Sequence, residues 1–193
     1  MFRFNYKNTD IIIISDTHGV HRKINIEQCD ILIHCGDVCN FGNEAEINDF
    51  MKWYNEQPAQ TKILVAGNHD IEFAKGLAAF ERFVPAGIDF LDNCNAVIKC
   101  DTENAEEITI STVPVRMEGI GRNWVSAKDV DILLTHCPPR GILDGRQHYG
   151  SRRLLEYVTK WQPKYHFFGH VHFDKPREGK IGNTTFINVT RKY

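Results

Sequence analysis

The sequence is divided by short apolar runs rich in β-branched residues, and most of these runs end at polar side chains. Several are continuous rather than alternating, which is typical of strands covered on both faces, so they predict a layered α/β fold. The weakly patterned segment Asn93–Glu107 is expected to form a hairpin or loop. The predicted strands are Ile11–Ser15, Ile31–His34, Lys62–Ala66, Ile108–Val113, Ile132–Thr135, His166–Phe168 and Thr185–Val189.

Helical patterns lie between the predicted strands. Glu44–Asn55 carries apolar residues at helical spacing, and Asn43 with Glu46 resembles a capping box at its start. A second helix is expected to begin after Ser151, which would be its N-cap, and a shorter one is expected to follow Asp70.

Length and charge limit the classes of protein to consider. The 193 residues suit one domain, and we expect a single domain over residues 1–193. A formal net charge of -2 gives no electrostatic reason to expect a duplex-DNA or membrane surface. A membrane or nucleic-acid partner therefore has no support from charge, although nucleic acid is not excluded, and the sequence does not indicate an oligomeric state.

Apolar runs and cysteines bear on the compartment. The longest fully apolar run, Ile11–Ile14, is too short to span a bilayer, and the first residues lack the apolar segment of a signal peptide, so we expect a cytoplasmic location. The six cysteines form no C-x-x-C pair and are expected to be reduced, mostly buried residues.

Polar groups follow five of the predicted strands, and together they form a set of candidate metal ligands. An extended backbone would point the side chains of Asp16 and His18 to the same side, and likewise those of His170 and His172. Open α/β sheets place their sites beyond the carboxyl ends of strands, so these groups are expected to meet. The seven candidates are Asp16, His18, Asp37, Asn68, His136, His170 and His172.

Each motif alone has an ordinary structural explanation. An Asp after a strand is often an N-cap, Gly-Asn is often a turn, and a lone His is usually structural. The joint order D-x-H, G-D, G-N-H-D, a lone His and G-H-x-H, within Ile11–Val189, resembles the calcineurin-like metallophosphoesterase family. The resemblance implies an α/β/β/α sandwich of four layers, with a dinuclear metal site at the carboxyl ends of the strands.

The resemblance also implies which residue does what. His69 would lie near the scissile ester, where it would protonate the leaving oxygen or stabilise charge on the phosphate, with Asp70 as its orienting partner. Asp37 would bridge two divalent ions that hold the attacking hydroxide. One ion would be held by Asp16, His18, Asp37 and His172, and the other by Asp37, Asn68, His136 and His170.

The mixed imidazole, carboxylate and amide ligands favour Mn²⁺, with Fe²⁺, Zn²⁺ or Ni²⁺ as alternatives. Because imidazoles must be neutral to bind a metal, activity is expected to collapse at acid pH.

Within the family, four segments look like the compact MPPED-type branch, which is similar to class III phosphodiesterases and whose members hydrolyse phosphodiesters. That implies a metal-dependent phosphodiesterase for a small or nucleotide-like substrate. The segments are Gly36–Gly42, Asp49-Phe50, Thr135–Gly141 and Thr184–Asn188.

Two features refine this prediction. Ser/Thr protein phosphatases continue G-D into x-V-D-R-G, whereas Asp37 is followed here by Val38-Cys39-Asn40-Phe41-Gly42, so protein phosphatase activity is not expected. Some animal members of the branch replace the first His of G-H-x-H by Gly, but His170 is present here. The alternatives are a nuclease or phosphomonoesterase on the same metals, and a non-catalytic interaction module, against which the complete ligand set argues.

Substrate contacts are predicted for Asn68, His69, Arg146 and His148. The last two lie in the loop Arg140–Gly150, which leaves a strand that ends at a ligand and could fold over the metals.

Three other histidines have structural explanations. His34 and His166 lie in apolar runs and are expected in the core with satisfied hydrogen bonds, whereas His21 is expected in a solvated loop.

Overall fold

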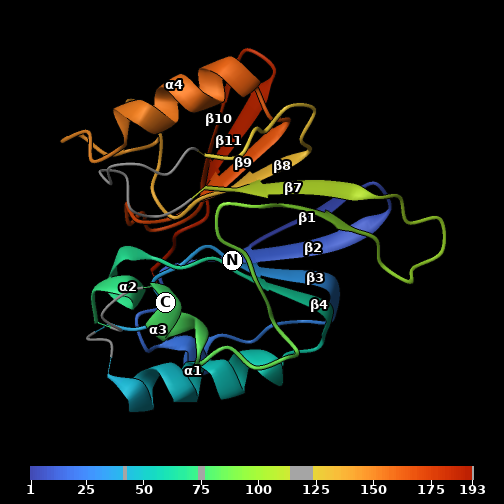
Figure 1. Cartoon of the computed structure of the whole chain (residues 1–193), viewed down its shortest axis with the longest axis vertical. Coiled ribbons are helices and arrows are strands. Elements are labelled where there is room, and N and C mark those ends of the chain that lie inside the picture. Colours follow the sequence, from blue (N-terminus) through green and yellow to red (C-terminus); the bar gives the residue numbers. More distant parts are fainter. Residues whose placement is uncertain (41–42, 74–76, 114–123, 193) are drawn as a thin grey trace.

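The computed structural model describes residues 1–40, 43–73, 77–113 and 124–192, with the backbone alone for 71–73 and 77. Phe41 and Gly42, which belong to one of the branch-like segments, lie outside the described residues. The structure has two β-sheets that lie between helices (Figure 1).

The first sheet contains the amino-terminal half of the strands in the order β1-β2-β3-β4-β5. Neighbouring strands from β2 to β5 run parallel, and β1 pairs with β2 in the antiparallel direction. The bounds are β1 Phe2–Tyr6, β2 Thr9–Ile14, β3 Cys29–His34, β4 Ala59–Leu64 and β5 Asp89–Phe90.

The second sheet has the order β10-β11-β9-β8-β7-β6. Its four central strands run parallel, and β10 and β6 pair with them in the antiparallel direction. The predicted hairpin over Asn93–Glu107 is confirmed by the pairing of β6 with β7. The bounds are β6 Asn95–Ile98, β7 Ile108–Thr112, β8 Ile132–Leu134, β9 Tyr165–Phe168, β10 Arg177–Ile181 and β11 Thr184–Asn188.

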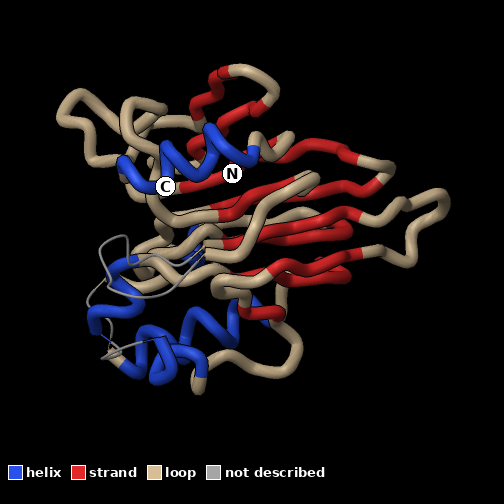
Figure 2. The backbone as a smooth tube through the Cα atoms, turned by 45° about the horizontal axis from the view of Figure 1, so that its top comes forward, coloured by secondary structure: helices blue, strands red, loops and turns tan. Residues whose placement is uncertain are grey.

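Helices cover the outer face of each sheet (Figures 1 and 2). The helices α1, α2 and α3 lie on the side of the first sheet, and α4 lies on the second, which confirms the predicted four layers. No helix in the described part of the chain has the length and apolar character needed to cross a membrane. The bounds are α1 Glu44–Asn55, α2 Asn68–Phe73, α3 Leu77–Glu81 and α4 Arg152–Trp161, with a 3-10 turn η1 at His21–Lys23.

The strand β2 shows why its apolar run is continuous. Ile11 and Ile13 belong to the core between the sheets, whereas Ile12 and Ile14 belong to the core under α1. All four side chains are fully buried. A strand with protein on both faces needs apolar side chains at every position.

The predicted helix starts are confirmed, with one shift. The Asn43 side chain accepts a hydrogen bond from the Glu46 amide at 2.9 Å, and Ser151 caps α4 by accepting from the Leu154 amide at 3.1 Å. The short helix was expected after Asp70, but α2 already begins at Asn68. The last three residues of the G-N-H-D motif therefore lie in the first turn of this helix, and Gly67 precedes it.

Three strands were not predicted: β1, the two-residue β5 and β10. In β1, Phe2, Phe4 and Tyr6 alternate with polar residues and pack against the core between the sheets. This period-2 pattern was a readable signal of a strand with one buried face. The edge strand β10 is largely exposed and polar, so its sequence carries no such pattern.

Of the three histidines with structural explanations, two are buried as predicted and the third differs from the prediction. His34 and His166 are fully buried, as predicted, although the Nδ1 atom of His166 has no hydrogen-bond partner within the described parts of the chain, contrary to the prediction that its hydrogen bonds are satisfied. His21 was expected in a solvated loop but is buried. Its ring contacts Phe50 edge-on and its Nε2 lies 3.0 Å from an Asp49 oxygen, so α1 provides the environment that the local sequence does not show.

Candidate metal centre

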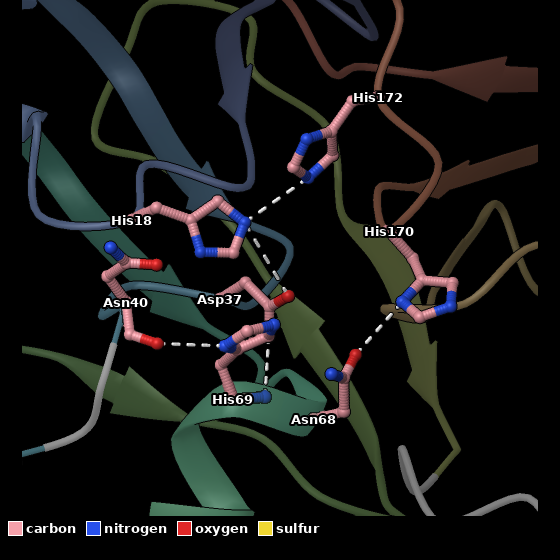
Figure 3. Close-up of a pocket in the computed structure, with 7 residues that line it drawn as sticks. All are labelled: His18, Asp37, Asn40, Asn68, His69, His170 and His172. Carbon is pink, nitrogen blue, oxygen red and sulfur yellow. Dashed lines mark hydrogen bonds and ion pairs between the residues drawn. The ribbon is translucent and has the colours of Figure 1, made fainter.

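The structure brings the predicted ligands together where the carboxyl ends of the two sheets meet. Asp16 and His18 follow β2, Asp37 follows β3 and Asn68 follows β4, whereas the other three histidines follow β8 and β9 of the second sheet. Three groups have ligand atoms within 4.8 Å of one another, and Figure 3 shows several of these side chains around one pocket. Two consist of predicted ligands alone, Asp16 with His18 and His172, and Asp37 with His136 and His170; the third joins His18 and Asp37 to His69.

The backbone that presents these side chains is not extended, contrary to the sequence-based reasoning. Asp16, His18, Asp37 and His170 have φ values of 54°, 40°, 59° and 66°. Non-glycine residues rarely adopt this left-handed conformation, and where they do so at functional sites the surrounding structure compensates for the strain. The two residues of each D-x-H or H-x-H pair converge because the chain turns sharply after each strand.

The glycines of the motifs allow close approach. A Cβ atom on Gly67 would lie 2.1 Å from an Asp37 oxygen, and one on Gly169 would lie 2.1 Å from an Asp16 oxygen. Real atoms do not come this close. The glycines next to Asn68 and His170 therefore let the backbone of one motif touch the carboxylate of another.

The two ring nitrogens of His136 face three oxygen atoms that accept hydrogen bonds. Its Nδ1 lies 2.8 Å from the Cys35 carbonyl, which assigns a donating hydrogen to Nδ1. The other ring nitrogen, Nε2, lies 3.0 Å from the Asn68 side-chain oxygen and 3.2 Å from Asp37 Oδ2. Three lone-pair atoms thus converge and need a proton or a metal cation between them.

The pKa values reflect this convergence. Burial disfavours the charged forms, but the attraction between the two side chains prevails, raising the pKa of His136 to about 10 and lowering the pKa of the Asp37 carboxyl well below its usual range. A proton on Nε2 thus satisfies the cluster in the absence of a cation. A divalent ion would displace that proton.

The second group has the same character and is more exposed. His18 Nδ1 lies 3.1 Å from the Cys39 carbonyl, and its Nε2 lies 3.2 Å from His172 Nε2. His172 Nε2 also lies 3.1 Å from Asp16 Oδ1, a contact that raises the pKa of His172. Burial opposes ionisation of Asp16, but the hydrogen bond with His172 leaves its pKa below the usual value.

The donor set fits two divalent cations that share Asp37. Asp37 Oδ2 lies 3.2 Å from His136 Nε2 and 3.8 Å from His18 Nε2, so a single carboxylate oxygen faces both groups. Carbonyl groups orient the far nitrogens of both histidines, which is the usual arrangement behind a metal-binding imidazole. Neutral imidazoles with carboxylate and amide oxygens suit ions of intermediate hardness.

His69 and Asp70 lie at the same site but interact differently from expectation. The His69 ring lies edge-on to His18, and its Nδ1 is 2.9 Å from the Asn40 carbonyl. The buried Asp70 carboxylate accepts from the amides of Asp37 and Gly67 at 2.9 and 2.8 Å. Burial raises the pKa of Asp70 to about 6. Asp70 therefore holds the turn at Asp37 through main-chain amides, and the Asn40 carbonyl orients His69. No sequence pattern indicates the role of Asn40, because a main-chain carbonyl performs it.

A cavity of about 380 Å³ opens above the candidate ligands. Arg146 and His148 are not among the described residues that line it. Their role in binding substrate stays a prediction. The lining residues are His18, Asp37, Asn40, Asn68, His69, His170 and His172.

The loop that carries Arg146 and His148 is fastened beside the centre. The His148 ring lies 3.1 Å from the buried Asp144 carboxylate, which also accepts from the Gly141 amide at 2.8 Å. The fully buried Asn188 donates to the Leu143 carbonyl at 3.4 Å and to the Val171 carbonyl at 3.0 Å. Asn188 thus joins the loop to the segment between the last two predicted ligands.

Comparisons with known proteins agree with this geometry. The sequence model of the calcineurin-like phosphoesterase family matches residues 9–174. A UPF0046 protein of Caenorhabditis elegans is 32% identical over 94% of this chain and 69% of its own length. Human metallophosphoesterase domain-containing protein 1 is 28% identical over 94% of this chain and 66% of its own length. The chain thus spans about two thirds of these relatives, which confirm the resemblance to the MPPED-type branch.

A solved structure shows the same fold at low identity. The phosphopantetheinyl hydrolase of Mycobacterium tuberculosis superposes with a TM-score of 0.64 at 15% identity, covering 94% of this chain and 89% of its own. At this level of identity the likeness shows the fold alone.

Proposed function

Since this chain belongs to the calcineurin-like phosphoesterase family, we propose that it is a metal-dependent phosphodiesterase that hydrolyses a small or nucleotide-like phosphodiester. The proposal depends on one observation: two groups of nitrogen and oxygen atoms with free lone pairs lie beneath an open cavity, and Asp37 Oδ2 faces both groups. When bound, two divalent ions would supply an activated water and neutralise charge on the phosphate.

The seven candidate ligands would hold the two ions in two sets. Asp16, His18 and His172 would hold one ion, and the more deeply buried His136 and His170 would hold the other together with Asn68. Asp37 would be the shared ligand. The buried position of Asp16, Asp37 and His136 keeps the first coordination shell fixed while the exposed His172 stands at the mouth of the cavity.

His69 is placed to act as the proton donor to the leaving oxygen. The Asn40 carbonyl accepts from Nδ1–H, so the proton for the leaving oxygen would come from the opposite nitrogen, Nε2, of the doubly protonated ring. The neutral ring with Nδ1–H has only a lone pair at Nε2. Its main-chain amide donates to Asp37 Oδ1 at 2.9 Å, which fixes the residue beside the shared carboxylate.

The charge of the cavity supports a diester over a monoester. Among its described lining residues there is neither an arginine nor a lysine. A phosphomonoester carries a charge of about −2 near neutral pH and is commonly held by arginine. A diester carries a single negative charge and depends less on such a cation.

The test is hydrolysis by metal-stripped protein with Mn²⁺ added back. We expect turnover of bis(p-nitrophenyl) phosphate above that of p-nitrophenyl phosphate, and no turnover before metal is added. Cyclic nucleotides and single-stranded nucleic acid complete the panel. A preference for the monoester or for nucleic acid would identify the alternative enzymes, and two bound metals without hydrolysis of any ester would favour an interaction module.

Two finer assignments belong to the same proposal. Mn²⁺ is proposed as the metal because the nitrogen and oxygen ligands suit intermediate ions, with Fe²⁺, Zn²⁺ and Ni²⁺ as the alternatives to compare in the same assay. A cytoplasmic location is proposed because all six cysteines are free thiols, as is usual in a reducing compartment.

A further inference from the structure

Two histidines of the centre depend on one short turn of the main chain. The Cys39 carbonyl lies 3.1 Å from Nδ1 of His18, and the next carbonyl, that of Asn40, lies 2.9 Å from Nδ1 of His69. These are consecutive peptide groups. If the turn moves, a predicted metal ligand and the predicted proton donor both lose the group that sets their ring orientation and tautomer.

The beginning of this turn is held from within the centre. The buried Asp70 carboxylate accepts from the amides of Asp37 and Val38 at 2.9 Å each, and the Val38 carbonyl accepts from the Gly19 amide at 3.1 Å. By Asn40 the chain has reached the surface. The end of the turn, which bears the His69 contact, therefore needs support from another element.

That support comes from the first turn of α1. Glu46 Oε1 accepts a hydrogen bond from the Asn40 amide at 2.8 Å. The same oxygen lies so close to Gly19 that a Cβ atom there would be 2.6 Å away, so the carboxylate sits between the His18 segment and the Asn40 segment. The Glu46 side chain is partly buried at this position, and Asn43 caps the helix that carries it.

We propose that Glu46 is a positioning residue, which fixes the Cys39–Asn40 turn so that its two carbonyls hold His18 and His69 with Nδ1 protonated. The role in catalysis rests on the proposed phosphodiesterase function. The role in orienting the two rings does not, because it concerns hydrogen bonds that exist in the metal-free protein.

The direct test is nitrogen NMR of the histidine rings in metal-free protein labelled at histidine. In the wild type we expect His18 and His69 to show the form protonated at Nδ1. In Glu46→Ala both sets of signals should shift toward the mixture of tautomers of a free imidazole. His136 is an internal reference, because its partner Cys35 lies outside the turn and its signals should not move.

Two matched variants separate the hydrogen bond from other effects. Glu46→Gln keeps an oxygen acceptor without the charge and should recover the wild-type ring signals. Glu44→Ala removes an exposed acidic residue from the same helical turn and controls for the charge at the start of α1. Should Glu46→Ala fail to fold, Glu46→Met keeps the side-chain length without an acceptor and serves in its place.

Metal affinity provides a second reading. Loss of an orienting group behind a ligand weakens metal binding by about 10-fold or more, so Glu46→Ala should bind Mn²⁺ that much more weakly, whereas Glu44→Ala should not. Unchanged ring signals of His18 and His69 in Glu46→Ala would overturn the proposal, even if activity fell. So would Glu46→Gln behaving like Glu46→Ala. A wild type that hydrolyses no phosphodiester would refute the proposed function alone, since the ring signals are read without substrate.

Discussion

Buried carboxylates lie at both ends of the parallel strands, but the groups that surround them differ. Asp131 lies just before β8 and is almost fully buried; Lys7 and Lys164 each approach it to 2.7 Å and the Tyr6 hydroxyl to 2.8 Å. At the other end, Asp37 Oδ2 instead faces the imidazole nitrogens of His136 and His18, at 3.2 and 3.8 Å. The first carboxylate is paired with two lysines, whose charge is permanent near neutral pH. The second is paired with the His136 imidazole, whose charge depends on a proton that a metal ion can displace.

This difference separates a stabilising cluster from a functional one. Buried charges are retained when they are paired and hydrogen-bonded, as at Asp131, which joins the β1–β2 turn to the second sheet. Buried lone pairs that converge on one point raise the free energy of the folded protein unless a proton or a cation lies between them. The centre around Asp37 is therefore built to be completed from outside the chain.

The same substitution in both clusters tests this contrast most strongly. Asp37→Asn removes the shared charge, and we expect phosphodiester hydrolysis to fall by roughly 1,000-fold or more because the electrostatic basis of the reaction is lost. Asp131→Asn should leave the activity of the folded protein unchanged. Initial rates with saturating Mn²⁺ measure both, and equal losses in the two variants would break the comparison.

A smaller loss is expected at His69. His69→Ala should reduce hydrolysis by about 100-fold, the usual range for a proton donor, while the protein still binds both metals. Metal content is measured after gel filtration, and rates are compared between two substrates that differ in leaving group. The better leaving group needs less protonation, so the loss of rate caused by His69→Ala should be smaller with that substrate. Loss of metal in His69→Ala would instead show that the ring is a ligand.

The stability of the opposite cluster should depend on pH. Asp131→Asn is expected to cost about 2 kcal/mol in the free energy of unfolding, the order expected when one partner of a partly buried pair is removed. Contacts with the lysines and hydrogen-bond donors outweigh burial and keep the pKa of Asp131 well below its usual range. Its contribution is therefore present above the unfolded pKa of about 3.9 and lost as pH falls further.

Urea unfolding of metal-free protein at pH 7 and at pH 3 measures this difference. The gap between wild type and Asp131→Asn should narrow at the lower pH. A gap that widens on acidification would contradict the assigned ion pairs.

The smallest effect is on metal affinity. Because the pKa of His136 is about 10 without metal, binding near neutral pH must displace its proton. One displaced proton lowers the apparent affinity by about 10-fold for each unit that pH falls. Titration with Mn²⁺ at pH 8 and pH 7 checks the slope, and an affinity independent of pH would mean that His136 is not a ligand.

Much of the fold could be predicted because burial on both faces shows directly in sequence. The continuous run Ile11–Ile14 and the stripe of Glu44–Asn55 each record which sides of an element face the core. The strand β10 could not be predicted, because an exposed edge strand needs no apolar pattern. The burial of His21 depends on Phe50 and Asp49 of a separate element, which local sequence does not reveal.

The candidate site was predictable in membership and less so in geometry. The ligand set could be placed because each member follows a strand of one sheet or the other. The left-handed backbone at Asp16 and His170 could not, since it arises from packing between motifs far apart in sequence, with Gly169 lying against Asp16. For the same reason the partners of Asp70 are main-chain amides that sequence motifs do not specify.

The most direct test of the central claim is electron paramagnetic resonance of the protein loaded with Mn²⁺. If Asp37 is shared by two ions, the wild type will bind two equivalents and show the signal of a spin-coupled Mn²⁺ pair, and Asp37→Asn will lose that coupling. A wild type that takes up one ion, or two ions with uncoupled signals, would contradict a centre completed by two cations on a common carboxylate.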